Sequence, residues 1–137
     1  MTDAFPKPSC WLAHRVSYGE TDAMGVVYYA NYLHLFERGR SELIRSLGFS
    51  YSVVEGRGIF LPVREATCRY LAPARYDDVI HIRTGLAGQT RASLNFVYEI
   101  TDGEHTQVLT RGTTQHAVVN AQGRPVRIPD WLSALFV

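Results

Sequence analysis

The sequence predicts an α+β fold in which an antiparallel sheet of five strands wraps around one long helix. Apolar residues recur at helical spacing in a single long segment, residues 31–47, whereas strand-like alternation or apolar runs occur once before it and four times after it. Short turns separate most of the strand segments, and strands joined in this way pair antiparallel. The economical packing buries the apolar face of the sheet against the helix.

Length and composition indicate one domain of ordinary globular character. The chain has 137 residues, 46% of them hydrophobic and 20% charged. A formal net charge of +1 argues against nucleic-acid or anionic-membrane binding, which requires a strongly basic surface. No apolar run approaches the roughly 18–20 residues that a membrane span needs, so we expect no membrane insertion and a cytoplasmic location.

Cys10 and Cys68 have neither metal-ligand spacing nor a secretory context that favours a disulfide. Residues 1–10 are expected to be a flexible lead-in to a single domain over residues 1–137.

The first strand is expected over residues 11–18, where Leu12, His14 and Val16 share one face. A loop follows over residues 19–27, with glycines at both Gly19 and Gly25 that permit unusual backbone angles. From about Asn31 the spacing becomes helical.

The long helix is predicted by an apolar face. Gly48 stands where a left-handed C-terminal cap is expected. Gly39 interrupts the helix and lowers its intrinsic stability by roughly 1 kcal/mol relative to Ala, which favours a close approach of another element at that point. The residues at helical spacing are Leu33, Phe36, Leu43, Ile44 and Leu47.

The remaining elements are expected to be a loop, four strands and a short C-terminal helix. The loop covers residues 51–58, and Asp102-Gly103 is a hairpin signal. Sheets with exposed edges tend to associate through them, which favours a dimer. The strands are expected over residues 62–71, 79–87, 91–100 and 107–119, and the short helix over residues 130–136.

Several common sites are absent from the sequence. It contains no G-x-S-x-G nucleophile elbow, no P-loop and no G-x-G-x-x-G before a helix. The five histidines are scattered without ligand spacing, so we expect no metal site. His14 and His116 lie on predicted strands, where packed or surface roles are more common than catalytic ones. Glu65 is an alternative acid, for which a salt bridge or a cap is the more ordinary role.

Asp22 is the candidate that remains, because it lies in the glycine-containing loop before the long helix. The N-terminus of that helix carries unpaired N–H groups and the positive end of the helix dipole. Such groups can stabilise the oxyanion that develops on a carbonyl under attack, while a carboxylate attacks the carbonyl or activates a water. The alternative from the residues alone is that Asp22 caps the helix or the turn.

The segment from Asp22 to Tyr32, DAMGVVYYANY, with Tyr18-Gly19-Glu20-Thr21 before it, resembles the active-site signature of the hotdog-fold acyl-CoA thioesterases. The similarity is to the branch of the 4-hydroxybenzoyl-CoA and YbgC-type enzymes. It extends over nearly the whole chain. The other matching segments are YLAPARYDD from Tyr70 to Asp78, Arg91-Ala92-Ser93, and Gly123-Arg124-Pro125 to Ile128-Pro129.

The resemblance implies a sheet wrapped around a long helix, which agrees with the pattern, and the hydrolysis of an acyl-CoA thioester. It implies that Asp22 is the nucleophile or general base, that the backbone N–H of Tyr29 binds the thioester carbonyl, and that Gly25 shapes the loop. It further implies active sites at a dimer interface, dimers that pair into tetramers, and no metal or redox cofactor. Coenzyme A is then part of the substrate and product, and acyl carrier protein is an alternative carrier. The candidate substrate-binding residues are Tyr28, Arg91, Ser93, Arg124 and Arg127.

One position departs from the pattern, because many YbgC-type members carry His where this chain has Tyr29. That change makes a histidine-assisted mechanism doubtful and favours an aromatic-lined pocket. Two other functions remain alternatives. One is a hotdog dehydratase or hydratase, which requires a His paired with an acid near the helix. The other is a non-catalytic protein that binds acyl-CoA or an acyl carrier.

Overall fold

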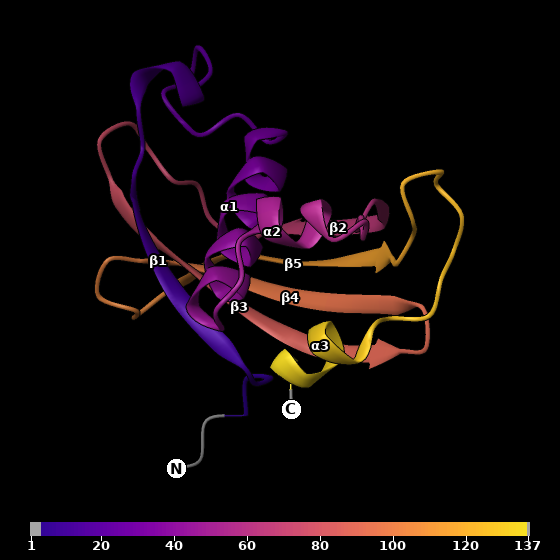
Figure 1. Cartoon of the computed structure of the whole chain (residues 1–137). Coiled ribbons are helices and arrows are strands. Elements are labelled where there is room, and N and C mark those ends of the chain that lie inside the picture. The colour runs from indigo at the N-terminus through magenta and orange to yellow at the C-terminus, as the bar shows by residue number, and fades with distance from the viewer. Residues whose placement is uncertain (1–3, 137) are drawn as a thin grey trace.

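The structure, a computed structural model, describes residues 4–136 and contains one long helix packed on one five-stranded antiparallel sheet (Figure 1). The long helix is α1 (Asn31–Ser46), and it follows β1 (Ser9–Arg15) and a 3-10 helix (Tyr18–Glu20). The other elements are α2 (Tyr51–Gly56), β2 (Val63–Tyr70), β3 (Val79–Thr90), β4 (Ser93–Asp102), β5 (Val108–Ala117), α3 (Asp130–Ser133) and a final 3-10 helix (Ala134–Phe136). The predicted α+β class is confirmed.

The strands are ordered β1-β3-β4-β5-β2, and every neighbouring pair is antiparallel. The three strands β3, β4 and β5 form a meander joined by turns, whereas β2 crosses to the far side and pairs with β5. In Figure 1 the sheet curves behind α1, and α3 covers one end of it. The two edges of the sheet are therefore β1 and β2, which flank α1 in the sequence.

The face of α1 that packs on the sheet forms the centre of the core. Phe36, Leu43 and Ile44 are fully buried, and the ring of Phe36 stacks on Tyr98 of β4 at a centroid distance of 4.3 Å. A Cβ atom built on Gly39 would lie 2.3 Å from Thr84 Oγ1 and 2.9 Å from Ile82 Cγ2. The close approach expected at Gly39 is confirmed, and the element that approaches is β3.

Some expectations for single residues and segments were wrong. Leu33 has the spacing of the apolar face, but it is 43% exposed near the beginning of α1. Residues 51–58 were expected to be a loop, yet α2 forms there because Ser50 caps it, its side chain accepting a hydrogen bond from Val53 N–H at 3.3 Å.

The last two residues of the lead-in expected over residues 1–10 belong to the first strand. Ser9 and Cys10 lie in β1 and pair with β3. Before them, Leu86 N–H donates to the carbonyl of Pro8, and Phe5 packs on Gly85. Residues 1–3 of the expected lead-in lie outside the described part of the chain. The strand begins early because β3 is long enough to pair with it.

The edge strand β2 is exposed along almost its whole length, with only Cys68 partly buried. An exposed edge strand presents backbone N–H and C=O groups that can pair with another chain. The structure thus provides the edge on which the expected dimer depends. Among residues 4–136, no helix is both long and apolar enough to cross a membrane.

Candidate active site

The loop between the 3-10 helix and α1 is held in place by its backbone. Gly25 has a φ of 79°, in the region that favours glycine, and its N–H donates to the carbonyl of Asp22 at 3.0 Å. Asp22 N–H donates to the carbonyl of Val26, which closes the turn. Val27 N–H donates to the carbonyl of Ala74, so the turn is also anchored to the segment after β2.

The carboxylate of Asp22 supports its own turn through one oxygen atom. Oδ1 accepts a hydrogen bond from Met24 N–H at 2.8 Å and a longer one from Val26 N–H at 3.5 Å. Within residues 4–136, no donor contacts Oδ2. The alternative that Asp22 caps its turn is therefore correct for one oxygen atom, while the other oxygen atom remains available to a ligand.

Asp22 does not cap α1. The N-cap residue is Ala30, which has no side chain able to accept a hydrogen bond. In the described chain, no acceptor contacts the backbone N–H groups of Tyr29 and Ala30, whereas Tyr28 N–H donates to the carbonyl of Glu20 at 2.9 Å. Free N–H groups at a helix N-terminus, reinforced by the helix dipole, form a site for a developing negative charge.

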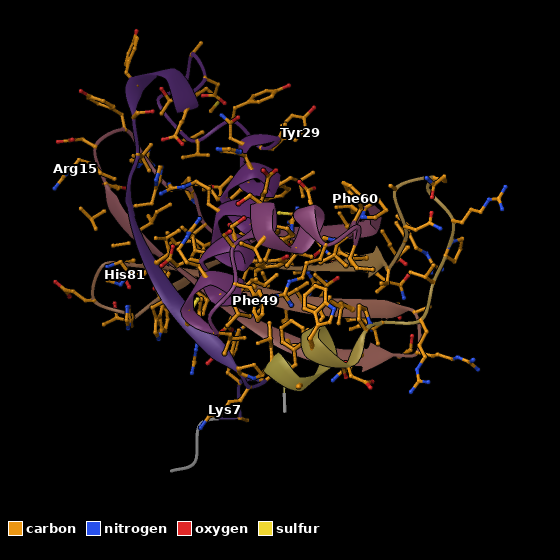
Figure 2. The ribbon with its side chains drawn as sticks, viewed as in Figure 1. Lys7, Arg15, Tyr29, Phe49, Phe60 and His81 are labelled. Atoms are coloured by element: carbon orange, nitrogen blue, oxygen red, sulfur yellow. The ribbon has the colours of Figure 1, made fainter. Side chains whose placement is uncertain are left out.

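Asp22 and Tyr29 line the same pocket, which has a volume of about 330 Å³. Tyr70 at the end of β2 donates its hydroxyl proton to the carbonyl of Tyr29 at 2.9 Å, and the ring of Tyr32 lies 5.2 Å from that of Tyr70. Tyr29 lies at the exposed N-terminal end of α1 in Figure 2. The ring of Tyr28 lies tilted beside it, 4.6 Å away between ring centroids, but Tyr28 does not line this pocket. The aromatic lining expected from Tyr28-Tyr29 is instead made by Tyr29, Tyr32 and Tyr70.

Sequence reasoning missed Tyr70 and Tyr32 as residues of this pocket. Each was noted only as part of a segment that matches the family. The strand alternation of residues 66, 68 and 70 was the available signal, because it places the Tyr70 side chain on the face that contacts α1.

The predicted substrate-binding arginines lie at the other end of the sheet. Arg91 and Arg127 line a second pocket of about 610 Å³ beside the turn between β3 and β4. Tyr70 of β2 pairs with Thr110 of β5, and Ser93 of β4 pairs with Ala117, which also lies on β5. These β5 positions are seven residues apart, which corresponds to roughly 23 Å along a strand. One chain therefore does not bring Arg91 near Asp22.

The other two predicted binding residues have different surroundings. Ser93 is only 6% exposed, and its hydroxyl shares a hydrogen bond with that of Thr90, so the side chain supports the turn between β3 and β4. Arg124 is exposed in the turn after β5, where its N–H donates to Asn120 Oδ1 at 3.0 Å. Arg124 does not line the pocket that contains Arg91 and Arg127.

The alternative acid and the histidines do not join the Asp22 pocket. Glu65 is exposed on β2, at the end of the strand opposite Tyr70. His116 is fully buried, and burial lowers its pKa to about 4 although its bond to the carbonyl of Leu61 acts in the opposite direction. Within the described residues, no three His, Cys, Asp or Glu side chains are grouped as metal ligands.

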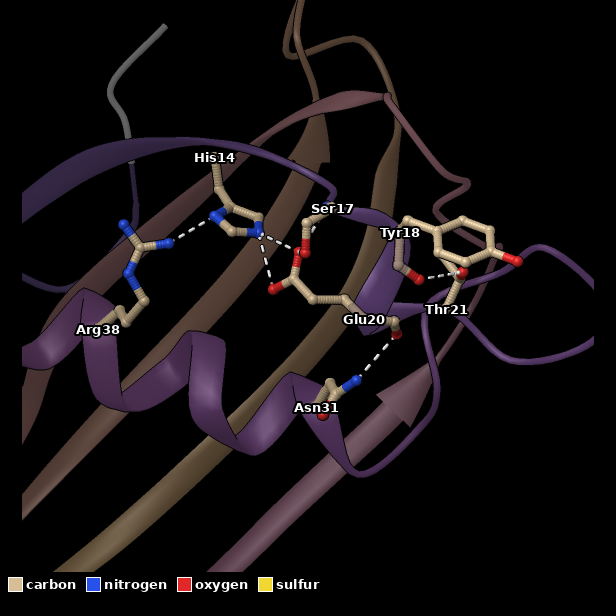
Figure 3. Close-up of polar contacts among 7 residues, drawn as sticks. All are labelled: His14, Ser17, Tyr18, Glu20, Thr21, Asn31 and Arg38. Atoms are coloured by element: carbon tan, nitrogen blue, oxygen red, sulfur yellow. Dashed lines mark hydrogen bonds and ion pairs between the residues drawn. The ribbon is translucent and has the colours of Figure 1, made fainter.

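His14 takes part in a polar network that sequence reasoning did not predict. Its ring contacts both carboxylate oxygens of Glu20 on one side and the guanidinium of Arg38 on the other (Figure 3). The spacing of these residues in the sequence gives no sign of this, since β1, the 3-10 helix and α1 meet only in the folded chain.

This fold has clear counterparts among known proteins. The family model of the thioesterase-like superfamily matches residues 16–136. The chain belongs to this superfamily, which places it among the thioester hydrolases and confirms the predicted hotdog fold.

Two curated relatives and one solved structure illustrate the similarity. The acyl-CoA thioester hydrolase YbgC of Escherichia coli is 40% identical over 92 residues, covering 67% of this chain and 69% of that protein. The acyl-CoA thioesterase YbgC of Haemophilus influenzae is 33% identical over 124 residues, covering 89% and 90%. The structure of a DHNA-CoA thioesterase from Staphylococcus aureus matches with a TM-score of 0.85 and 30% identity, covering 92% of this chain and 87% of that one.

Proposed function

We propose that the protein is an acyl-CoA thioesterase in which Asp22 is the nucleophile or general base and the N-terminus of α1 is the oxyanion site. The observation that carries the proposal is that Asp22 and Tyr29 line one pocket, each with a free group. Asp22 offers Oδ2, and Tyr29 offers its backbone N–H. Relatives named as acyl-CoA thioesterases support the choice of substrate.

The chemistry requires little more than these groups. In the general-base route, the Asp22 carboxylate takes a proton from water as the oxygen attacks the thioester carbon. The carbonyl oxygen becomes an oxyanion that accepts hydrogen bonds from the N–H groups of Tyr29 and Ala30. The C–S bond then breaks, coenzyme A leaves as a thiolate that takes up a proton, and the carboxylic acid is released. In the nucleophilic route, the Asp22 carboxylate attacks the thioester carbon, the C–S bond breaks and coenzyme A leaves as a thiolate that takes up a proton. Water then hydrolyses the resulting anhydride to the carboxylic acid and the Asp22 carboxylate.

The proposed scheme uses no metal or redox cofactor, and coenzyme A participates only as part of the substrate and product. The hydratase alternative requires a His paired with an acid near the helix, and His14 is paired with Glu20. It is less compatible with the geometry because Arg38 occupies the other ring nitrogen of His14 and neither His14 nor Glu20 lines the Asp22 pocket. The remaining alternative is a protein that binds acyl-CoA or acyl carrier protein without turnover. A cytoplasmic location fits the proposed activity.

The position of the arginines supports a dimer as the active form. Antiparallel pairing of two exposed β2 strands would place the Tyr70 end of one chain beside the Val63 end of the other. The end of the sheet that carries Arg91 and Arg127 would thereby approach the Asp22 pocket of the second chain, where these arginines would meet the phosphates of coenzyme A. Light scattering measures whether the assembly is such a dimer or a tetramer of two dimers.

The test is Asp22→Asn, measured by release of free coenzyme A from short, long and aromatic acyl-CoAs. Asn keeps an oxygen that can accept from Met24 N–H, so the turn is preserved while the carboxylate is lost. We expect kcat/KM to fall by about 100-fold or more, as for removal of a general base, with an unchanged circular-dichroism spectrum.

Glu65→Gln is the matched control, because it neutralises the alternative acid on an exposed strand. It should retain wild-type kcat/KM. Wild-type turnover by Asp22→Asn would exclude Asp22 as the catalyst, and a large loss in Glu65→Gln alone would transfer that role to Glu65. Binding of acyl-CoA without turnover of any of these thioesters by the wild type would instead identify a non-catalytic binding protein.

A further inference from the structure

The side chain of Glu20, the last residue of the 3-10 helix, is partly buried and makes several hydrogen bonds. Its Oε1 accepts hydrogen bonds from Ser17 N–H at 2.7 Å and from the Ser17 hydroxyl at 3.0 Å. His14 Nε2 lies 2.8 Å from Oε1 and 3.0 Å from Oε2. Partial burial acts to raise the pKa of Glu20, but these hydrogen bonds outweigh it and hold the pKa below its usual value. The carboxylate is therefore charged and fully engaged.

The contact with Arg38 indicates which ring nitrogen of His14 accepts a hydrogen bond and which one donates. A guanidinium only donates hydrogen bonds, so His14 Nδ1 must accept from Arg38. His14 Nε2 then carries the ring proton and donates it to Glu20. The result is a directed chain from Arg38 on α1 through His14 on β1 to Glu20 in the 3-10 helix (Figure 3).

The main chain of Glu20 extends this connection to the proposed oxyanion site. Its carbonyl accepts from Tyr28 N–H at 2.9 Å and from Asn31 Nδ2 at 2.8 Å. Tyr28 N–H is thereby occupied, and Tyr29 N–H is the next one along the chain that is free. Asn31 is the first residue of α1, so Glu20 joins the segment before Asp22 directly to the beginning of the helix.

We infer that Glu20 is a positioning residue, whose ties to His14 and Arg38 hold the Asp22 turn in register with the N-terminus of α1. The inference rests on the proposed function, since it concerns the alignment of Asp22 with the Tyr29 N–H. Glu20 lies two residues before Asp22, so any rotation of the 3-10 helix moves the carboxylate relative to the helix end. Misplacement of a reacting group by about 1 Å can lower a rate by about 100-fold.

The experiment compares Glu20→Ala, which removes every side-chain contact, with Glu20→Gln, which keeps an oxygen able to accept from Ser17 and His14. Glu20→Ala should lower kcat by about 10- to 100-fold while KM changes by less than about threefold, because alignment rather than binding is lost. Glu20→Gln should restore kcat to within about threefold of the wild type. Glu104→Ala, at an exposed carboxylate in the turn between β4 and β5, is the matched control and should retain wild-type values.

Two further measurements separate positioning from general stability and from the proposed function itself. Arg38→Met removes only the donor to His14, so it should lower kcat less than Glu20→Ala does, and adding it to Glu20→Ala should cause no further loss. Amide exchange of Tyr28, whose N–H donates to Glu20, should accelerate in Glu20→Ala while amides in β4 keep their wild-type exchange.

Wild-type kcat in Glu20→Ala, together with a large loss in Asp22→Asn, would overturn the positioning role alone. Independent, multiplicative losses from Glu20→Ala and Arg38→Met would also overturn it. Amide exchange at Tyr28 does not depend on the substrate, so faster exchange in Glu20→Ala supports the link between Glu20 and the helix end by itself. Failure of the proposed function would appear in a different measurement, as wild-type turnover by Asp22→Asn.

Discussion

The packing of α1 on the sheet makes a sharp prediction for Gly39→Ala. A methyl group at this position would lie 2.3 Å from Thr84 Oγ1 and 2.9 Å from Ile82 Cγ2, distances that real Cβ atoms do not tolerate. Thr84 and Ile82 are both fully buried on β3, so neither side chain has free space to move into. The helix must shift away from the sheet or the strand must yield.

Two opposing effects determine the magnitude. Replacing Gly by Ala inside a helix gains about 1 kcal/mol of intrinsic stability. Overpacking a buried site costs about 1–3 kcal/mol and occasionally more. Because two buried side chains are approached at once, we expect the cost to prevail and the free energy of unfolding to fall by about 1–2 kcal/mol. For a domain of this size that corresponds to a decrease in Tm of about 3–8 °C.

The assay is urea unfolding of Gly39→Ala followed by circular dichroism, with Gly56→Ala as the matched control. Gly56 also lies in a helix, but nothing approaches a Cβ there within 4 Å, so its substitution should leave stability unchanged or slightly higher. In the described chain Thr84 Oγ1 has no hydrogen-bond partner, so Thr84→Ala should cost little and should recover part of the loss in Gly39→Ala. A Gly39→Ala protein as stable as the wild type would refute the close approach.

Two further predictions concern pH and the pocket. Burial lowers the pKa of His116 to about 4 in the folded chain, below the unfolded value of about 6.5, so the unfolded state binds a proton first as the pH falls. As the pH falls from 6.5 to 4, His116 should thus lower the free energy of unfolding by up to about 1.4 kcal/mol per pH unit. Unfolding measured at several pH values should show a shallower decrease in His116→Gln than in the wild type. The control His34→Gln, at an exposed histidine, should behave like the wild type. Tyr70→Phe removes the hydroxyl that donates to the Tyr29 carbonyl, and should lower kcat by about two- to tenfold with little change in Tm; an unchanged kcat would show that this bond does not hold the helix end.

Local patterns in the sequence were sufficient for the elements that build the core. Two patterns indicate which face of an element is buried: the helical spacing of Phe36, Leu43 and Ile44, and the alternation along β4. Both can be read from the sequence, because side chains on one face recur with the period of the helix or strand. Gly39 marked a close contact because a glycine in a helix interior lowers intrinsic stability unless packing requires it. The similarity around Asp22 identified the loop and the enzyme class for the same reason, since the relevant residues are contiguous.

The tertiary structure decided everything that depends on which distant segments meet. The pairing of β2 with β5 rather than β3 brings Tyr70 to the beginning of α1, and no local pattern specifies that partner. It also places Arg91 and Ser93 at the opposite end of the sheet from Asp22. Arg38 and His14 are in contact although they are 24 positions apart, and His14 and Glu20 although they are 6 apart. The three residues lie on three different elements. Sequence determined the long helix and the five strands, because local periodicity sets them, and it identified the Asp22 loop, because its residues are contiguous. The surroundings of Asp22 were decided by the fold, because they are contacts between segments that only the folded chain brings together.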